Sequence, residues 1–326
     1  MVMETVIVFV VTGLLSLLHR THVATAMALA VGLTGCSSSQ THTAGSGSAT
    51  KPPAPCPTAP VSVVVSVDQW GDIVSELGGA CANVKTVLAS SSVDPHDYEP
   101  SPADAASFTG AALVVVNGAG YDAWASKLAA SSAPSAHLVS AAAATKTPDG
   151  ANPHLWYQPA AVNTVADAVT SELSKISPRA ADYFGQRRAQ FTTAMNPNVN
   201  LIAKIKNAAG GKSYGATETL FDYQAQALNL VNKTPDGYQR ATANESDPSP
   251  ADISAFLKAL AGKQIDVLIY NTQTEGSIPE QIRSAAEQAG VPVVNVTETV
   301  PPGQTSFEAW QYSQLVALGK ALGVPV

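Results

Sequence analysis

Short apolar runs alternate with helix-like segments along most of the chain. Val61–Val67 and Leu113–Asn117 have the nearly continuous apolar character of strands buried on both faces of a sheet. We predict strands at Val61–Val67, Val84–Leu88, Leu113–Asn117, His137–Ser140, Lys212–Thr217, Asp266–Thr272 and Val291–Val296. We predict helices over Trp70–Leu77, Ser101–Phe108, Tyr121–Ala130, Ala251–Leu260, Glu280–Gln288 and Phe307–Leu322, and a helical stretch from Ala160 to Lys206 broken near Pro178 and Pro197.

Strands that alternate with helices indicate an α/β fold, in which helices cover both faces of a parallel sheet. The long helical stretch in the middle of the chain divides the strands into two groups. We therefore predict two lobes, each with a parallel sheet flanked by helices, joined by one long helix. The predicted boundaries are 61–177 for the first lobe, 178–206 for the linking helix and 207–326 for the second lobe.

A six-residue segment occurs twice in similar form. Glu99-Pro100-Ser101-Pro102-Ala103-Asp104 returns as Asp247-Pro248-Ser249-Pro250-Ala251-Asp252. Each copy begins a predicted helix, and a hydrophobic strand that ends in Asn follows each of them, at Asn117 and Asn271. Six residues can recur by chance in a chain rich in Ala and Pro, but the shared context favours two related lobes.

The N-terminal region has the order of a bacterial secretion signal. Basic residues around Arg20 precede an apolar stretch from Val23 to Leu33, and Leu33-Thr34-Gly35-Cys36 resembles a lipobox. We predict a signal peptide over 1–35, lipidation of Cys36 and a flexible tether over 36–60, whose Ser, Thr, Gly, Ala and Pro cannot form a core. The alternative is a free cysteine after a hydrophobic segment. A second apolar stretch, Met1–Leu18, is either an upstream start-site artefact or part of a long signal.

Two further cysteines, Cys56 and Cys81, each lie shortly before a predicted strand. If those strands are parallel neighbours, their beginnings lie side by side, and export makes a disulfide between the two cysteines plausible. Such a bridge would close a loop of about 25 residues and contribute on the order of 3 kcal/mol. The alternative is two separate buried thiols.

Composition excludes one class of partner. The chain has 326 residues, a hydrophobic fraction of 45%, a charged fraction of 13% and a formal net charge of -7, which together indicate a folded, mildly acidic protein. Nucleic-acid binding depends on clustered Lys and Arg, so the sequence argues against it.

Candidate metal ligands follow four predicted strands. His96 comes after Val84–Leu88, His154 after His137–Ser140, Glu218 after Lys212–Thr217 and Glu275 after Asp266–Thr272. Ligands of parallel α/β sheets bind beyond the carboxyl ends of the strands. Imidazole suits zinc, copper, iron and nickel, whereas carboxylate oxygens suit manganese and magnesium. Two imidazoles and two carboxylates, two from each lobe, therefore predict a site for a first-row transition metal.

Each of these residues has a plainer interpretation. A lone loop histidine usually lies on the surface, and we assign that role to His137 because it begins a strand. His96 and His154 differ because each follows a proline in an aromatic turn segment. Glu218 is either a ligand or a carboxylate that favours the dipole of the helix after it. Glu275 is as consistent with an exposed surface residue as with a ligand.

Asp94-Pro95-His96-Asp97-Tyr98-Glu99-Pro100 and Asn152-Pro153-His154-Leu155-Trp156-Tyr157 resemble the two signature motifs of the zinc/manganese solute-binding proteins of ABC transporters. The resemblance runs from about Val61 to Leu322 and includes Asn117-Gly118, Phe221-Asp222-Tyr223 and the segment from Pro292 to Glu298. It implies a rigid linking helix and a metal ion in the cleft between the lobes. The family's first two ligands fall on His96 and His154.

The resemblance places the third ligand at Glu218, where the family has His or Glu. The fourth is an acidic residue on a loop after a strand of the second lobe, for which Glu275 is the nearest match, with a water molecule or Gln273 as alternatives. Zinc, manganese and iron all remain candidates. Two carboxylates favour manganese or iron, while intrinsic affinity favours zinc over manganese.

The predicted function is that of a metal receptor and not an enzyme. The resemblance implies a monomer, anchored by lipid on the extracytoplasmic face of the cell membrane, that delivers the ion to an ABC permease and its ATPase. The alternatives are a secreted metallohydrolase and an adhesin or structural lipoprotein stabilised by metal. The sequence has no His-Glu-x-x-His or serine-hydrolase motif that would support catalysis.

Overall fold

The computed structural model describes residues 55–89, 98–274 and 276–326. The signal and Cys36, most of the tether, His96 and Glu275 lie outside these ranges. The strands are β1 (Val61–Val67), β2 (Ala82–Leu88), β3 (Leu113–Val116), β4 (His137–Ser140), β5 (Ser213–Ala216), β6 (Val231–Asn232), β7 (Val267–Asn271) and β8 (Val293–Val296). The helices are α1 (Asp68–Gly78), α2 (Pro102–Ser107), α3 (Ala123–Ser132), α4 (Ala141–Thr145), α5 (Pro159–Ile176), α6 (Ala181–Ala194), α7 (Asn196–Ala209), α8 (Asp222–Ala227), α9 (Asp236–Ala243), α10 (Pro250–Ala261), α11 (Ser277–Ala289) and α12 (Phe307–Ala321), with short 3-10 turns η1 (Gly79–Cys81), η3 (Leu155–Tyr157) and η4 (Pro178–Ala180).

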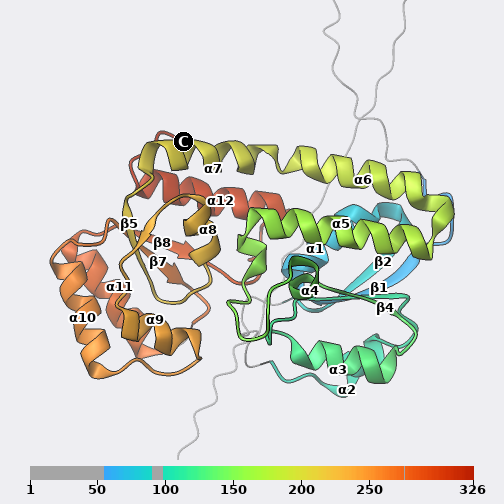
Figure 1. Cartoon of the computed structure of the whole chain (residues 1–326), viewed down its shortest axis with the longest axis horizontal. Helices are drawn as coiled ribbons and strands as arrows, with labels where there is room; N and C mark the ends of the chain where they lie inside the picture. The colour runs from blue at the N-terminus through green and yellow to red at the C-terminus, as the bar shows by residue number, and fades with distance from the viewer. Residues whose placement is uncertain (1–54, 90–97, 275) are drawn as a thin grey trace, which may run out of the picture. The chain divides into compact units, whose positions relative to one another are not determined.

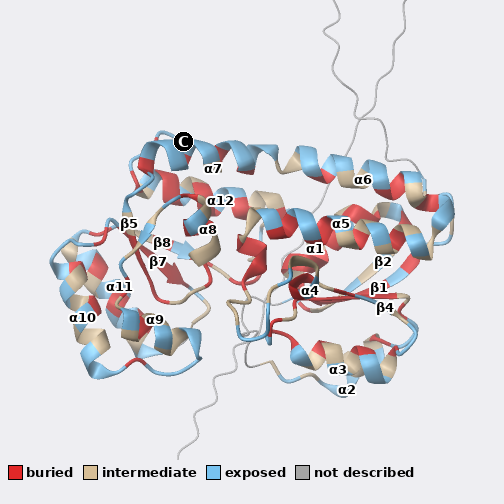
Figure 2. Ribbon diagram, in the orientation of Figure 1, coloured by how far each residue is buried: buried red, intermediate tan, exposed pale blue. Residues whose placement is uncertain are grey.

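Two separate parallel sheets confirm the predicted α/β class. Their strand orders are β2-β1-β3-β4 and β6-β5-β7-β8, so both sheets have the same topology. The central strands β3 and β7 are buried along their whole length, as expected where helices cover both faces. Figure 2 shows this arrangement, with buried strands and with helices whose outward sides are exposed.

The repeated segment has the same local role in both sheets. The Ser101 hydroxyl accepts a hydrogen bond from Asp104 N at the start of α2, and the Ser249 hydroxyl accepts one from Asp252 N at the start of α10. Such N-caps satisfy amide groups that the first helical turn leaves without partners. The helices lead to β3 and β7, so Asn117 and Asn271 come at equivalent places at the ends of equivalent strands.

The connection between the two sheets is a long helical stretch with a one-residue interruption at Met195, near the break predicted at Pro197. It consists of η4, α6 and α7, and α6 and α7 follow one another along one side of both sheets in Figure 1. Pro197 lacks the amide hydrogen that would bond to the carbonyl of the preceding turn, which explains the interruption at Met195. The sequence patterns also missed α4, α8, α9 and β6, which are short.

The beginnings of β1 and β2 lie side by side, and a disulfide bond joins the residues that precede them. Cys56 and Cys81 are bonded, with an S–S distance of 2.04 Å. Strands β1 and β2 are parallel neighbours in which Val61 pairs with Ala82, so the beginnings of both strands lie together. The bridge ties the segment that precedes β1 to the turn that precedes β2.

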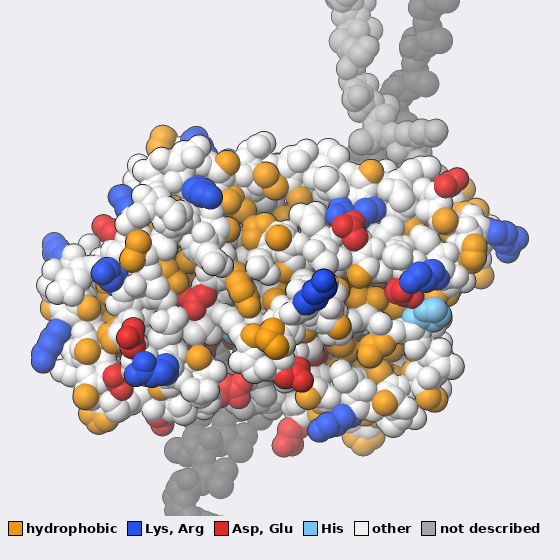
Figure 3. Space-filling view, viewed as in Figure 1, with side chains coloured by type: hydrophobic (Ala, Val, Ile, Leu, Met, Phe, Trp, Pro, Cys, Tyr) orange, Lys and Arg blue, Asp and Glu red, His pale blue; other side chains and the backbone are white. Residues whose placement is uncertain are grey.

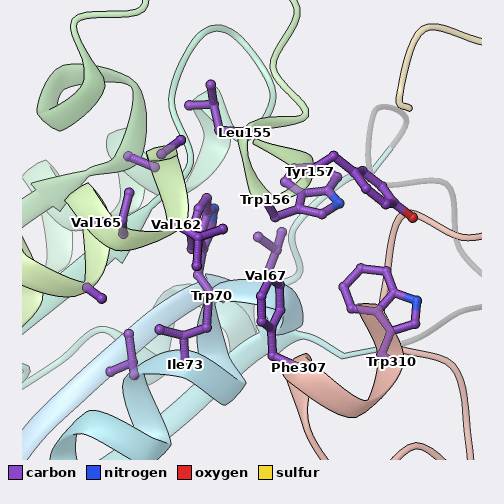
Figure 4. Close-up of a cluster of buried hydrophobic side chains, with 14 of the residues drawn as sticks. Val67, Trp70, Ile73, Leu155, Trp156, Tyr157, Val162, Val165, Phe307 and Trp310 are labelled. Carbon is purple, nitrogen blue, oxygen red and sulfur yellow. The ribbon is translucent and has the colours of Figure 1, made fainter. Parts of the chain in front are cut away.

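A cluster of aromatic side chains joins the two halves of the described chain. Trp156 and Tyr157 of η3 meet Phe307 and Trp310 of α12 beside Trp70 of α1, as Figure 4 shows. The ring centroids of Tyr157 and Trp310 lie 5.9 Å apart, and the Tyr157 ring is also 5.3 Å from Phe221. This packing makes the position of η3 depend on elements that belong to both sheets.

Carboxyl groups collect where α1 meets α12. Asp72, Glu76 and Glu308 each bring an oxygen within 4.8 Å of the others, and Asp68 lies one turn earlier on α1. Burial raises the pKa of Asp68 to about 7. Burial, followed by the charge of Glu308, raises the pKa of Glu76 to about 7 as well. The junction is therefore more stable with protons on these groups than with full negative charge.

Because of these carboxyl groups, we expect the free energy of unfolding to decrease as the pH rises. A carboxyl group whose pKa is raised on folding binds more protons in the folded state, so the free energy of unfolding falls between the two pKa values. For Asp68 this window extends from 3.8 to about 7. The melting temperature should fall from about pH 5 to about pH 8, and Glu76→Gln should reduce the fall. The matched control is Glu99→Gln, which changes an exposed acid. An equal fall in both variants would contradict this account.

Candidate metal centre

A cleft of about 530 Å³ opens between the two sheets. Tyr121 and His154 line it from the side of the first sheet, and Glu218 and Thr274 line it from the side of the second. The structure thus brings together, at the carboxyl ends of strands in both sheets, two of the residues that the sequence singled out. His96 and Glu275 lie outside the described residues, and their predicted roles stay predictions.

His154 is buried, with 3% of its surface exposed. Its Nδ1 lies 2.7 Å from Oδ1 of Asn152, which also accepts a hydrogen bond from the backbone N of His154. Because the Nδ2 of Asn152 donates to the carbonyl of Thr219, the Asn152 oxygen is the atom that faces the ring. Nδ1 therefore carries the hydrogen in the neutral ring, and the lone pair of Nε2 points toward the cleft.

The loop after β3 is hydrogen-bonded to the segment that carries His154. Asn117 donates from Nδ2 to the carbonyl of Pro153 at 2.9 Å and accepts a hydrogen bond from Trp70 Nε1 at 2.9 Å. The carboxylate of Asp122 accepts hydrogen bonds from the backbone N of Asn117 and of Gly118. Gly118 has a φ of 78°, and a Cβ there would lie 2.6 Å from the Ser140 hydroxyl. Glycine is required because both conformation and space exclude a side chain.

Glu218 follows β5 and belongs to no helix. The acidic residue in the first turn of α8 is Asp222, so the helix-dipole interpretation of Glu218 does not hold. Oε2 of Glu218 accepts a hydrogen bond from Asn271 Nδ2 at 2.5 Å. Burial, and next the charge of Glu298, raise the pKa of the Glu218 carboxyl above its ordinary value.

Glu298 is the residue that the sequence reasoning missed. It lies two positions beyond β8 and is 1% exposed. Its Oε2 is 3.7 Å from Nε2 of His154 and accepts a hydrogen bond from the Tyr121 hydroxyl at 3.0 Å. Its Oε1 accepts a hydrogen bond from Asn271 Nδ2 at 3.1 Å. The rule that led to the other candidates, a polar residue just after a parallel strand, would have found it.

Gln273, the alternative fourth ligand, is hydrogen-bonded to the loop that follows β8. Its Oε1 accepts hydrogen bonds from the backbone N of Glu298 at 2.7 Å and of Thr299 at 3.0 Å. The amide oxygen is thus engaged in holding the loop that carries Glu298. His137 lies on the surface, as predicted, where its Nδ1 is 2.8 Å from a carboxylate oxygen of Glu172.

The arrangement of one imidazole nitrogen, one buried carboxylate (Glu298) and one half-buried carboxylate (Glu218) suits a divalent cation. A zinc ion lies about 2.0–2.2 Å from nitrogen and oxygen ligands, so two ligand atoms of one tetrahedral ion are separated by roughly 3.3–3.6 Å. The 3.7 Å between His154 Nε2 and Glu298 Oε2 is close to that separation. A cation there would also offset the mutual repulsion of Glu218 and Glu298.

Comparison with known proteins agrees with the fold. The model of the family described as "Zinc-uptake complex component A periplasmic" matches residues 63–321. The high-affinity zinc uptake system protein ZnuA of Bacillus subtilis is 23% identical over 231 residues, which are 65% of this chain and 71% of that protein. A metal ABC transporter substrate-binding lipoprotein of Lactococcus lactis is 22% identical over 256 residues, 73% of this chain and 79% of that protein.

A solved structure has the same fold at low identity. The structure of the SBP FpvC from Pseudomonas aeruginosa in complex with Mn2+ superposes with a TM-score of 0.68 and 20% identity, covering 81% of this chain and 98% of that chain. At this identity the likeness concerns the fold alone.

Removing the charge of Glu298 should stabilise the metal-free protein. Glu298→Gln keeps the size of the side chain and an oxygen for the Asn271 hydrogen bond, while it ends the repulsion of Glu218. We expect the melting temperature of the metal-free variant at neutral pH to rise by a few degrees, measured by differential scanning calorimetry with chelator present. An unchanged or lower melting temperature would contradict this expectation.

Proposed function

The chain belongs to the family of the zinc-uptake complex component A, and we propose that His154, Glu218 and Glu298, together with His96, hold the one divalent metal ion that it captures. As the solute-binding component of an ABC transporter, it passes this ion to a permease and its ATPase. The observation that carries the ligand assignment is the 3.7 Å approach of Glu298 Oε2 to His154 Nε2 in a buried setting.

Support for this set comes from how each atom is directed. Asn152 fixes the ring of His154 through Nδ1, with Nε2 on the side of Glu298. Glu218 and Glu298 come from the second sheet, so the ion would join the two halves of the chain. Because its ligands come from both halves, a bound metal ion would influence how the two halves are positioned. This suits a receptor whose permease must distinguish the metal-bound form from the metal-free form.

Attachment to the membrane belongs to the same proposal. Among the helices of the described residues, none is both long and apolar enough to cross a membrane. The lipobox at Cys36 and the tether after it would hold the receptor at the extracytoplasmic face, close to its permease. We propose that the receptor acts there as a monomer and catalyses no reaction.

The distribution of charged side chains on the surface is consistent with a small cation as the ligand. On the face seen in Figure 3, Lys and Arg side chains are scattered among Asp and Glu, and they do not gather into one basic area. A partner that carries many phosphates would need such an area. The cleft has the buried acidic and imidazole groups, which suit a cation instead.

Metal-linked melting tests the ligand set. Zn2+ at about 1,000 times its dissociation constant stabilises the folded state by roughly 4 kcal/mol, which raises the melting temperature by on the order of 10 °C. We expect His154→Ala, Glu218→Gln, Glu298→Gln and His96→Ala each to lose most of this rise. His137→Ala is the matched control, since it removes a histidine on the surface, and it should retain the full rise.

The comparison of Glu298→Gln with Glu275→Gln decides between the two candidates for the fourth ligand. Loss of the metal-induced rise in Glu298→Gln alone supports the proposal, whereas loss in Glu275→Gln alone contradicts it. Stoichiometric metal binding by His154→Ala would refute the whole site. Turnover of esters, peptides or phosphoesters by the metal-loaded wild type would favour the hydrolase alternative.

A further inference from the structure

We propose that Asn271 determines which metal the site prefers, by restricting both carboxylates to ligation through a single oxygen. This inference rests on the proposed function, since it concerns the same site. It assigns a specificity-determining role to a residue that need not touch the ion.

The orientation of the Asn271 amide follows from its hydrogen bonds. Its Oδ1 accepts a hydrogen bond from the backbone N of Gln273 at 3.0 Å. Its Nδ2 lies 2.5 Å from Oε2 of Glu218 and 3.1 Å from Oε1 of Glu298. A flipped amide would place an oxygen against two carboxylates and an NH2 group against a backbone N–H, so the assigned orientation is the one that pairs donors with acceptors. Both hydrogens of the NH2 group are directed at carboxylates.

Asn271 therefore holds one oxygen of each acid. In Glu298 the held atom is Oε1, while Oε2 is the oxygen that faces His154. The Tyr121 hydroxyl donates to Oε2 from the first half of the chain, so the Glu298 carboxylate is fixed at both of its oxygens. An oxygen that accepts one hydrogen bond can still bind an ion, so what matters is orientation: the two bonds hold Oε2 on the side of His154 and Oε1 on the side of Asn271. Chelation by both oxygens of an ion at His154 would require the carboxylate to rotate out of this position.

Asn271 itself has little freedom to follow such a rotation. It is 1% exposed and ends the buried strand β7, and its backbone N donates to the Thr217 hydroxyl. A positioning group that is rigid and buried transmits its geometry to the ligands it bonds. The cost of chelation is then the loss of a charge-assisted hydrogen bond in a buried site.

Single-oxygen ligation favours a low coordination number. With His96 as the second imidazole of the proposed ligand set, two single carboxylate oxygens would complete the four ligands of a tetrahedral zinc site. Manganese is typically bound by six oxygen-rich ligands in octahedral geometry. Chelating carboxylates would supply extra oxygens for manganese, and the hydrogen bonds of Asn271 oppose that arrangement. The site as built should prefer zinc by more than the intrinsic difference between the two ions.

The test is the ratio of affinities for Zn2+ and Mn2+ in the full chain and in Asn271→Ala, measured by competition titration with a chromogenic chelator. We expect Asn271→Ala to weaken zinc binding by about 10- to 100-fold, the usual effect of losing a group that orients a ligand. Manganese should lose much less, so the preference for zinc should fall by about tenfold or more. Equal weakening of both metals would overturn the inference, because a merely structural residue affects them alike.

Asn117→Ala is the matched control, at the equivalent strand end of the first sheet. Asn117 bonds to the carbonyl of Pro153 and to no carboxylate, so its loss should weaken both metals without changing their ratio. A ratio changed equally in both variants would contradict the assignment to Asn271. Tyr121→Phe removes one hydroxyl group and keeps Asn271, and it should change the ratio less than Asn271→Ala does.

Cobalt substitution gives a second readout that does not depend on affinity. Co2+ in the wild-type site should show the intense visible absorption of tetrahedral cobalt, and Asn271→Ala should show the weaker bands of higher coordination. Identical cobalt spectra would overturn the inference even if affinities changed. Failure of the wild type to bind any of these metals would refute the proposed function, whereas normal binding with an unchanged ratio would refute only the role of Asn271.

Discussion

Two carboxylates lie close to one another at the cleft between the sheets, the buried Glu298 and the half-buried Glu218, and the account of the site depends on this pair. Like charges in a buried setting raise the free energy of the folded state unless protons, hydrogen-bond donors or a cation compensate. Asn271 compensates in part, because one NH2 group donates to both acids. A bound divalent ion would compensate more fully. In the proposed site, the same repulsion that would make the metal-free protein less stable would therefore favour binding of a cation, a familiar cost of a functional site.

The two sheets contribute to this site in comparable ways. An asparagine ends or follows the third strand of each sheet: Asn117 positions the segment of His154, and Asn271 positions the two acids. Each is buried, and each lies beyond the helix that the repeated Ser-Pro-Ala-Asp segment begins. The two halves therefore share an asparagine as well as the helix caps of the repeat. The side-chain amide of Asn117 donates to the carbonyl of Pro153, whereas that of Asn271 donates to the carboxylates of Glu218 and Glu298.

Much of the fold could be predicted because the strands are apolar on both faces. Val61–Val67 matches β1 residue for residue, and the alternation with helices was enough to predict parallel sheets. Elements such as β6, with two residues, and α9 carry too few positions for a periodic pattern. The predicted helix from Tyr121 was also wrong at its start, since α3 begins at Ala123 and leaves Tyr121 in a turn that reaches Glu298.

Residues that line the cleft were predictable from a strand end, as at Glu218, or from a strand end followed by a motif, as at His154. Glu298 was missed because Glu275 offered an acid after an earlier strand, although the same strand-end rule also applies to Glu298, two positions beyond β8. The position of Glu298 depends on Gln273, whose Oε1 accepts hydrogen bonds from the backbone N of Glu298 and Thr299, 25 and 26 positions further along the chain. Contacts of such range follow from the packed tertiary structure and leave no periodic signal in the sequence.

Anomalous diffraction from crystals grown with Zn2+ tests the central claim most directly. The account predicts one strong peak about 2.0–2.2 Å from His154 Nε2 and from one oxygen each of Glu218 and Glu298. The competing acidic cluster of Asp72, Glu76 and Glu308 should be empty of ordered zinc. A peak in that cluster and none at His154, or a peak at His154 that Glu298 does not reach, would contradict the account.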